Sequence, residues 1–537
     1  MLLPLGDRAS ERTPTDGFVT APPDSTAIQP PSYVAMSSGT VAAAPPAEPS
    51  RALPATLFIA AAVTLALGIL VGRGGSGFVA WIGQVAQHVL FATSAGLVIG
   101  GLVTRSPEGV AELSLRWEMA TRREALRSLA LTGAQLGLLW LAFVRFSIEN
   151  EAFYQKIAVL AFSGFVVNYF LPLRQRLLYF FVLSLLGIVT VMGMQNGAWL
   201  LAIGLVLMGV CHLPIRYGAR VALLVGIGGL LALGRVERLP VPWSTALWPI
   251  MGSFFMFRLI VYLYDMEHAK EKPTVLSALS YFFLLPNVVF PFFPVVDYTV
   301  FRKQYYDEEE FAIYQRGVRW MMRGTLQLIA YRVVYQYLTI PITSVHTAAD
   351  VGIYMLTTYL LYIRVSGQFH LVTGMLHLFG FNLPRTHNRY FLASSMLDYW
   401  RRINIYWKDF MLKLVFYPVY FRLKKYGEVR ALVLGTSIVF VATWLLHSYQ
   451  WFWLLGEFPL TWNDVIMWGV IGGAVVVNTL YERKRKPGRQ LQPATFSLRT
   501  HAPVVLRTAA TFVFICVLWS LWTSPSVTDW VAMVSLN

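Results

Sequence analysis

The feature that most constrains this chain is a series of apolar segments, each about as long as a bilayer is thick. Apolar residues make up 56% of the 537 residues and charged residues only 13%, against roughly 25% charged residues in a soluble domain. A helix needs about 20 mostly apolar residues to cross a bilayer. The candidate segments are residues 54–72, 77–103, 127–147, 156–173, 177–193, 196–214, 219–234, 243–265, 276–296, 324–343, 350–364, 430–455, 463–481 and 504–523. The sequence therefore predicts an all-α polytopic membrane protein with about 11–14 transmembrane helices.

The charge of the chain fits the same class. There are 44 basic and 28 acidic residues, a net charge of +16, and many of the bases stand in short loops between apolar segments. Such loops are cytoplasmic under the positive-inside rule, so we expect the bases to set orientation and expect no nucleic-acid partner. The only two cysteines, Cys211 and Cys516, lie in apolar segments. They are too few for a disulfide framework or a cysteine-based metal site.

The chain divides into four parts by sequence character. Residues 1–50 are rich in Pro, Ala, Ser and Thr without apolar periodicity, so we expect a disordered tail and no signal peptide. Residues 51–270 hold plain N-terminal spans, and residues 457–537 hold the C-terminal spans. Residues 271–456 are aromatic, interrupted by Pro and polar at membrane depth. Irregular backbone at that depth is tolerated where it is buried or lines a cavity, so the third part is expected to contain the functional core.

One polar run stands out within that core. Residues 365–411 carry Asn404, Arg401 and Arg402, and an isolated histidine, His447, follows inside an apolar segment. Charged and amide side chains are costly in hydrocarbon, so in a membrane protein they indicate a functional site. An imidazole accepts protons near neutral pH, and an amide donor stabilises a developing oxyanion. These residue types together favour group transfer.

The basic clusters predict how this part crosses the membrane. One cluster lies in residues 401–430 and a second in residues 483–489, and we expect both to be cytoplasmic. The segments 430–455 and 463–481 then run outward and back. With a rise of 1.5 Å per residue, His447 lies roughly 25 Å along its helix, whereas Asn404 is expected near the inner side. This separation suits a tunnel better than a surface pocket.

The polar run also carries a resemblance to a known family. The segment SGQFHLVTGMLHLFGFNLPRTHNRYFLASSMLDYWRRINI resembles the hallmark segment of the membrane-bound O-acyltransferases, nearest the branch of alginate O-acetylases and teichoic acid D-alanyl transfer proteins. The matching residues are Ser366, Gly367, Gly374, Gly380, Phe381, Leu383, Pro384, Asn388, Ser395, Trp400, Arg401 and Arg402. Pro286 and Pro291 upstream, with His447 and Trp451 downstream, extend the resemblance over residues 286–451.

The chain departs from the pattern of this branch at several positions. Asn404 stands where the branch has a histidine, and His370 stands where it has an aspartate. Leu446 and Ser448 replace the Trp and Gly beside the family's catalytic histidine. Branches that acylate lipids and sterols also carry asparagine at the position of Asn404. The resemblance is therefore that of a divergent member, with either a changed substrate or lost activity.

The resemblance implies a helical bundle with a central tunnel in a bacterial cytoplasmic membrane. An acyl group, acetyl or another short acyl, moves from a cytoplasmic thioester to a hydroxyl of a glycan or lipid acceptor. The thioester is an acyl-CoA such as acetyl-CoA, or an acyl carrier protein, and no bound cofactor or metal is implied. Surrounding membrane lipids and an extracytoplasmic accessory transferase are the other expected partners. We assign His447 as general base and Asn404 as the amide that orients the acyl carbonyl. The residues expected to bind substrate or donor are Trp400, Arg401, Arg402, Asp398, His370 and Trp451.

Each of these assignments has a simpler alternative. His447 fits a packed core histidine, and Asn404 fits a helix cap. Arg401 and Arg402 fit interface residues whose charged ends reach water, with Asp398 paired to one of them. His370 lies seven residues before His377, near one helical face, but no carboxylate at close spacing supports a metal site.

Two other classes of function remain open from the sequence. In a glycan or lipid transporter or polymerase, the same polar residues line a translocation path, and charged residues in both halves are required. In an inactive scaffold related to the acyltransferases, His447 and Asn404 are individually dispensable and no thioester is consumed.

Overall fold

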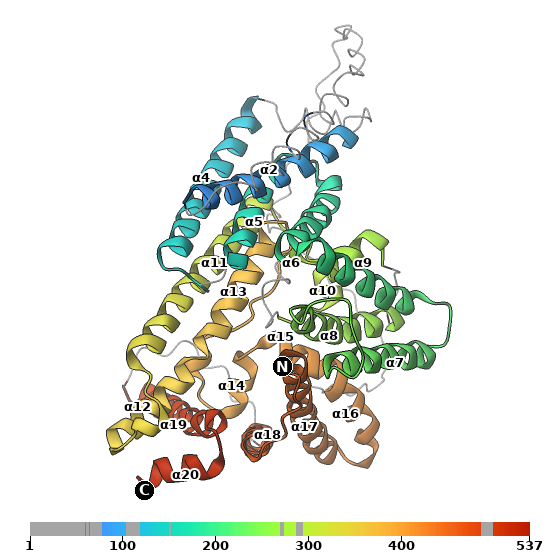
Figure 1. Ribbon diagram of the computed structural model, residues 1–537. Coiled ribbons are helices and arrows are strands. Elements are labelled where there is room, and N and C mark those ends of the chain that lie inside the picture. Colours follow the sequence, from blue (N-terminus) through green and yellow to red (C-terminus); the bar gives the residue numbers. More distant parts are fainter. Residues whose placement is uncertain are drawn as a thin grey trace, which may run out of the picture. The chain divides into compact units, whose positions relative to one another are not determined.

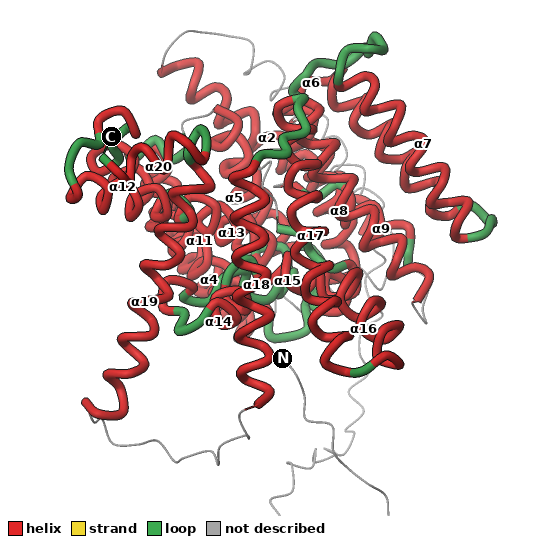
Figure 2. The backbone as a smooth tube through the Cα atoms, turned by 90° about the horizontal axis from the view of Figure 1, so that it is seen from below, coloured by secondary structure: helices red, strands yellow, loops and turns green. Residues whose placement is uncertain are grey.

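A computed structural model describes residues 78–103, 119–149, 152–268, 273–285, 294–484 and 498–536, together with positions 60 and 64. These residues form helices and connecting loops without any strand (Figures 1 and 2). Their only strand-like pairing is an isolated bridge between Tyr305 and Phe381. The all-α prediction is thus confirmed for the described residues. The expected tail, the matched prolines Pro286 and Pro291, and the first expected span apart from positions 60 and 64 lie outside them.

Seven helices in the described part are long and apolar enough to cross a membrane. Their segments are Arg122–Arg145, Leu173–His212, Tyr217–Arg235, Leu247–His268, Glu428–Leu455, Trp462–Lys484 and His501–Thr523. This set agrees with a multi-pass membrane protein, but it is smaller than the expected number of 11–14 transmembrane helices. Part of the difference arises because several predicted spans are merged into one helix, are short or are irregular.

The N-terminal helices follow the predicted spans closely. They are α2 (Phe78–Val103), α4 (Met119–Arg145), α5 (Ala152–Phe170), α6 (Leu173–His212), α7 (Tyr217–Arg235) and α8 (Leu247–His268). The long α6 contains the predicted span 177–193 and all but the last two residues of 196–214. It is interrupted at Gly193, whose φ of 78° and ψ of 166° are not helical. A Cβ on Gly197 would lie 3.3 Å from Ile188 Cγ2, so the second half bends sharply back against the first.

The predicted span 276–296 is not one continuous helix. Here α9 (Val275–Phe282) is only 8 residues long, and Phe283 leaves the helical conformation with φ −106° and ψ 55°. The buried Arg258 of α8 donates hydrogen bonds to the carbonyls of Tyr281 (3.0 Å) and Phe282 (3.2 Å). Since the last carbonyls of a helix lack partners within it and attract cations, Arg258 stabilises this early end. A short α10 (Tyr298–Lys303) follows, capped by Asp297.

The middle of the chain is built on two long neighbours, α11 (Glu310–Val333) and α13 (Ile363–His377). A π-helical turn, Val334–Leu338, extends α11, and α12 (Ala348–Leu360) precedes α13. The predicted spans 324–343 and 350–364 therefore correspond to the end of α11 with its π-turn and to α12.

Four glycines allow α11 and α13 to approach each other closely (Figure 1). A Cβ on Gly324 of α11 would lie 2.6 Å from the carbonyl oxygen of Gly367 in α13. About two turns away along the same contact, a Cβ on Gly374 of α13 would lie 2.7 Å from the carbonyl oxygen of Gly317 in α11. Small residues at helix contacts are typical of membrane bundles. Gly367 and Gly374, which belong to the family resemblance, thus have a packing role.

The C-terminal part places its basic clusters at one end. Its helices are α14 (Met396–Arg402), α15 (Ile405–Met411), α16 (Tyr417–Leu423), α17 (Glu428–Leu455), α18 (Trp462–Lys484), α19 (Leu498–Thr523) and α20 (Val527–Ser535). Arg483 at the end of α18 pairs with Glu428 at the start of α17 at 2.8 Å. Arg401 at the end of α14 pairs with Glu482 of α18 at 3.0 Å. The two clusters expected on one side of the membrane therefore meet, as far as the described residues reach.

The glycine contact leads to a prediction about stability. Gly324→Ala should destabilise the protein by about 1–3 kcal/mol, because the new methyl group meets backbone rather than a movable side chain. Gly226→Ala on α7 is the matched control, since no atom lies within 4 Å of its Cβ position and alanine is the better helix former. Thermal unfolding of both variants in detergent measures the difference. Equal melting temperatures would contradict a tight contact.

Candidate functional site

A cavity of about 300 Å³ lies among α8, α13, α14, α15, α17, α18 and α19. It is lined by Phe257, Val295, Tyr362, Val365, Phe369, Tyr399, Trp400, Ile403, Asn404, Trp407, His447, Gln450, Trp451, Leu454, Met467, Trp468, Ile471, Trp519 and Trp522. Four of the residues predicted from the sequence are among them: Asn404, His447, Trp400 and Trp451. Asn404 and His447, expected far apart across the membrane, therefore line the same cavity.

The hydrogen bonding of His447 determines which of its nitrogens is free. Its Nδ1 lies 2.9 Å from the carbonyl oxygen of Thr443, one turn earlier on α17. A carbonyl only accepts, so Nδ1 carries the hydrogen and Nε2 of the neutral ring is an acceptor. Nε2 makes no hydrogen bond to the described residues, and the side chain is only partly buried. An acceptor nitrogen is therefore available to a ligand.

Two tryptophans hold the His447 ring in place. Trp407 meets it edge-on, with ring centroids 5.4 Å apart, and Trp468 of α18 lies against it at 4.7 Å. The indole Nε1 of Trp407 donates to Thr443 Oγ1 at 3.4 Å, so the same threonine orients both rings. Rigid support of this kind positions a reacting group accurately.

Asn404 combines a structural task with a free donor. Its backbone is left-handed, with φ 35° and ψ 63°, and its side-chain oxygen accepts from the backbone N–H of Trp407 at 3.3 Å. Asparagine tolerates that backbone better than most residues and is a favoured helix cap. The side-chain oxygen of Asn404 therefore caps α15, as the helix-cap alternative expects. The amide Nδ2 has no hydrogen-bond partner in the described part of the chain, and it stays available as a donor.

Taken together, these groups provide an acceptor and a donor within aromatic walls. An imidazole nitrogen can take a proton, and an amide N–H can bind a carbonyl oxygen or an oxyanion. The lining also holds Tyr362, Gln450 and Tyr399, and burial raises the pKa of the Tyr399 hydroxyl well above its ordinary value. That phenol is neutral at physiological pH and adds no charge to the site.

The structure does not bring the predicted charged residues to this cavity. Arg402 donates to Asp398 at 2.7 Å, one turn apart on α14, which is the pairing expected for Asp398. Arg401 binds Glu482 at 3.0 Å. None of the three lines the cavity. Both arginines are thus engaged with carboxylates, as structural or interface residues would be.

His370 also lies away from the cavity, in the contact between α11 and α13. Its ring stacks on Trp320 at 4.8 Å, and its Nδ1 lies 2.5 Å from Gln327 Oε1. His377 bonds through Nδ1 to the carbonyl of Thr373 at 2.7 Å. The Nε2 atoms of both histidines are buried. Among the described residues, no three His, Cys, Asp or Glu side chains lie close enough to hold a metal ion.

Sequence reasoning missed several residues of the cavity. Trp407 and Thr443 were not predicted as site residues, although their spacing was a signal. Trp407 is the third helical residue after the cap Asn404, and Thr443 lies one turn before His447. Gln450 lies between His447 and Trp451, which both belong to the resemblance, but it was not predicted as a site residue. Trp468, Trp519 and Trp522 reach the cavity from α18 and α19, and nothing in a single sequence connects those helices to the polar run.

The comparisons with known proteins add no family assignment. No protein-family model matches the chain, and no curated protein sequence matches it significantly. The described fold supports the class of all-helical, multi-pass membrane proteins.

The dual task of Asn404 predicts different effects of two substitutions. Asn404→Ala should lower stability by about 1 kcal/mol or more through loss of the cap, with a further cost from the left-handed backbone. Asn404→Asp keeps an oxygen for the Trp407 N–H and tolerates the same backbone, so its melting temperature should stay near that of the wild type. Thermal unfolding in detergent compares the two. A drop as large for aspartate as for alanine would argue against the capping role.

Proposed function

We propose that the protein is a membrane-bound acyltransferase that moves an acyl group from a thioester to a hydroxyl acceptor. The observation that carries this proposal is that His447 and Asn404, which offer an acceptor nitrogen and a donor amide, line one aromatic cavity. The resemblance to the O-acyltransferase pattern supports the same pair: His447 stands at the position of the catalytic histidine, and Asn404 stands where lipid- and sterol-acylating branches carry asparagine.

The proposed reaction uses each group once. Asn404 Nδ2 donates to the thioester carbonyl oxygen, while His447 Nε2 accepts the proton of the acceptor hydroxyl. The hydroxyl oxygen attacks the carbonyl carbon, and the negative charge that develops on the carbonyl oxygen is stabilised by the amide. The carbon–sulfur bond then breaks, and the thiolate takes the proton from His447. The products are an ester and a free thiol, so no net proton or electron is consumed.

The walls of the cavity suit this chemistry. Trp400, Trp451 and Trp468 surround the reacting groups with apolar surface, and exclusion of water strengthens electrostatic interactions and limits hydrolysis of the thioester. We propose that the cavity is the inner part of a tunnel, reached by a cytoplasmic acyl-CoA or acyl carrier thioester from one side and by a glycan or lipid hydroxyl from the other. An extracytoplasmic transferase would then complete delivery in a bacterial cytoplasmic membrane.

The test of His447 uses the purified protein in nanodiscs with radiolabelled acetyl-CoA or palmitoyl-CoA. Acceptors are the lipid and glycan extracts of the native cells, and label transferred to either extract is counted. His447→Ala should lower transfer by about 10²–10⁴-fold through loss of the base, with an unchanged elution profile. His346→Ala is the control, because His346 is exposed and lies outside the cavity; it should retain full transfer.

The result also separates the rival functions. A wild-type protein that moves no label from either donor, with His447→Ala indistinguishable from it, would overturn the proposal and favour an inactive scaffold. Movement of glycan or lipid across the membrane without consumption of thioester would instead favour a transporter.

The donor role of Asn404 is tested separately from its structural role. Asn404→Asp retains the helix cap but removes the N–H donor and places a negative charge beside the developing oxyanion. Transfer should fall by about 10²–10³-fold while the melting temperature is preserved. The acyl-CoA assay above measures the loss. Wild-type transfer by this variant would show that Asn404 acts only as a cap.

A further inference from the structure

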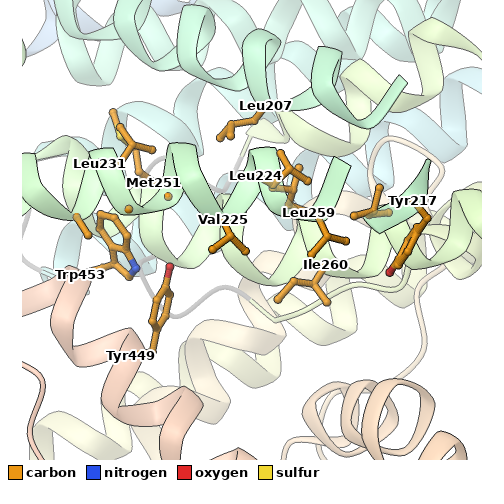
Figure 3. Close-up of a pocket in the computed structure, with 15 residues that line it drawn as sticks. Leu207, Tyr217, Leu224, Val225, Leu231, Met251, Leu259, Ile260, Tyr449 and Trp453 are labelled. Atoms are coloured by element: carbon orange, nitrogen blue, oxygen red, sulfur yellow. The ribbon is translucent and has the colours of Figure 1, made fainter. Parts of the chain in front are cut away.

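A second cavity lies on the other side of α17, in a groove between α7 and α8. Its volume is about 520 Å³, within the range of roughly 300–1,000 Å³ that is usual for ligand pockets. Figure 3 shows Leu224 and Val225 of α7 facing Leu259 and Ile260 of α8 across it. The lining is aliphatic and aromatic, and its only side-chain hydroxyls belong to Tyr217 and Tyr449. Such a surface fits a hydrocarbon ligand.

Two glycines on α7 create much of this space. Gly228 and Gly229 line the groove, and no atom lies within 4 Å of the Cβ position of either. They contrast with the glycines between α11 and α13, where backbone fills the equivalent space. The space in the groove therefore exists because glycine has no side chain at these two positions, and no neighbouring helix fills it.

The groove is fixed at one end and open along its length. Arg235, the last residue of α7, donates to the carbonyls of Trp453 and Leu454 at 3.1 Å each, which ties this end to α17. Further along, Val225 is 69% exposed and Ile260 40% exposed. All four helices that line the groove, α6, α7, α8 and α17, are long and apolar enough to cross a membrane. We therefore expect the opening to face the hydrocarbon of the bilayer.

The length of the groove and the charge at its ends bear on the kind of ligand that it fits. The lining of α7 runs from Tyr217 to Ala232, roughly 22 Å at 1.5 Å per residue, which is longer than one leaflet of a hydrocarbon core of about 30 Å. At the Tyr217 end, Arg216 is exposed and makes no ion pair with the described residues. Nearby Arg220 donates through Nε to the carbonyl of Leu213 at 3.0 Å, and its Nη1 lies 3.9 Å from the carboxylate of Glu267. Arg235 at the other end is engaged with the carbonyls of Trp453 and Leu454, whereas Arg216 is available at the Tyr217 end to an anionic headgroup.

We propose that this groove binds one acyl chain of an anionic phospholipid, with the phosphate at Arg216 and the chain running along α7 toward Trp453. The site is separate from the proposed acyl-transfer cavity and does not depend on the activity proposed for it. The apolar lining accounts for the chain, and the bases at the Tyr217 end account for the headgroup.

The test uses the full-length protein in nanodiscs of equal parts phosphatidylcholine and phosphatidylglycerol, with a photoreactive group in one acyl chain of the phosphatidylglycerol. After irradiation, labelled peptides are located by mass spectrometry. We expect label concentrated on the facing sides of α7 and α8. Gly228→Leu fills the groove and should lower this label by about ten-fold. Gly226→Leu is the matched control on the same helix, because Gly226 does not line the groove, and it should leave the label unchanged.

The headgroup is tested with Arg216→Gln. This variant should remove the preference for labelled phosphatidylglycerol over labelled phosphatidylcholine while labelling of the groove persists. Equal labelling of all apolar helices in the wild type, or an equal effect of Gly228→Leu and Gly226→Leu, would overturn the proposal. A dimer crosslinked through α7, with no lipid label, would show that a second copy of the chain covers the groove instead.

Discussion

The close contact between α11 and α13 is the constraint on which the candidate site depends. Gly317 and Gly324 meet Gly374 and Gly367 so closely that backbone touches backbone. The side of α13 that carries its glycines faces α11, which leaves Tyr362, Val365 and Phe369 to line the cavity with His447. A side chain at any of these glycines would push the helices apart and move that wall. The four glycines thus help to set the shape of the cavity, although none of them lines it.

Much of the fold was predictable because apolar length is a strong signal. The helices α7, α8, α17, α18 and α19 coincide with predicted spans, since a bilayer demands a minimum length of hydrophobic helix. The prediction of a continuous span at 276–296 was wrong because a contact from another helix ends α9 early. Arg258 binds the carbonyls of Tyr281 and Phe282 and favours an end to α9, and no pattern within 276–296 could reveal an arginine supplied by another helix.

The site was predictable in part. His447 and Asn404 were identified because a histidine in an apolar segment and an amide in a polar run are expensive and therefore informative. Arg401 and Arg402 are adjacent to that run but turn toward Asp398 and Glu482, since sequence proximity does not determine the direction of a side chain. Trp468, Trp519 and Trp522 come from helices that carry no distinguishing signal of their own. Their role in the cavity became visible only through the packing of α18 and α19.

The last turns of α17 form a shared wall between two cavities. Tyr449 and Trp453 line the groove beside α7, whereas Gln450 and Leu454 line the cavity that holds His447. Where both cavities bind their ligands better in one arrangement of these turns, occupation of one cavity alters the affinity of the other, and thermodynamic linkage makes that effect reciprocal. A single helix then couples the lipid-facing groove to the cavity that His447 lines without any moving domain.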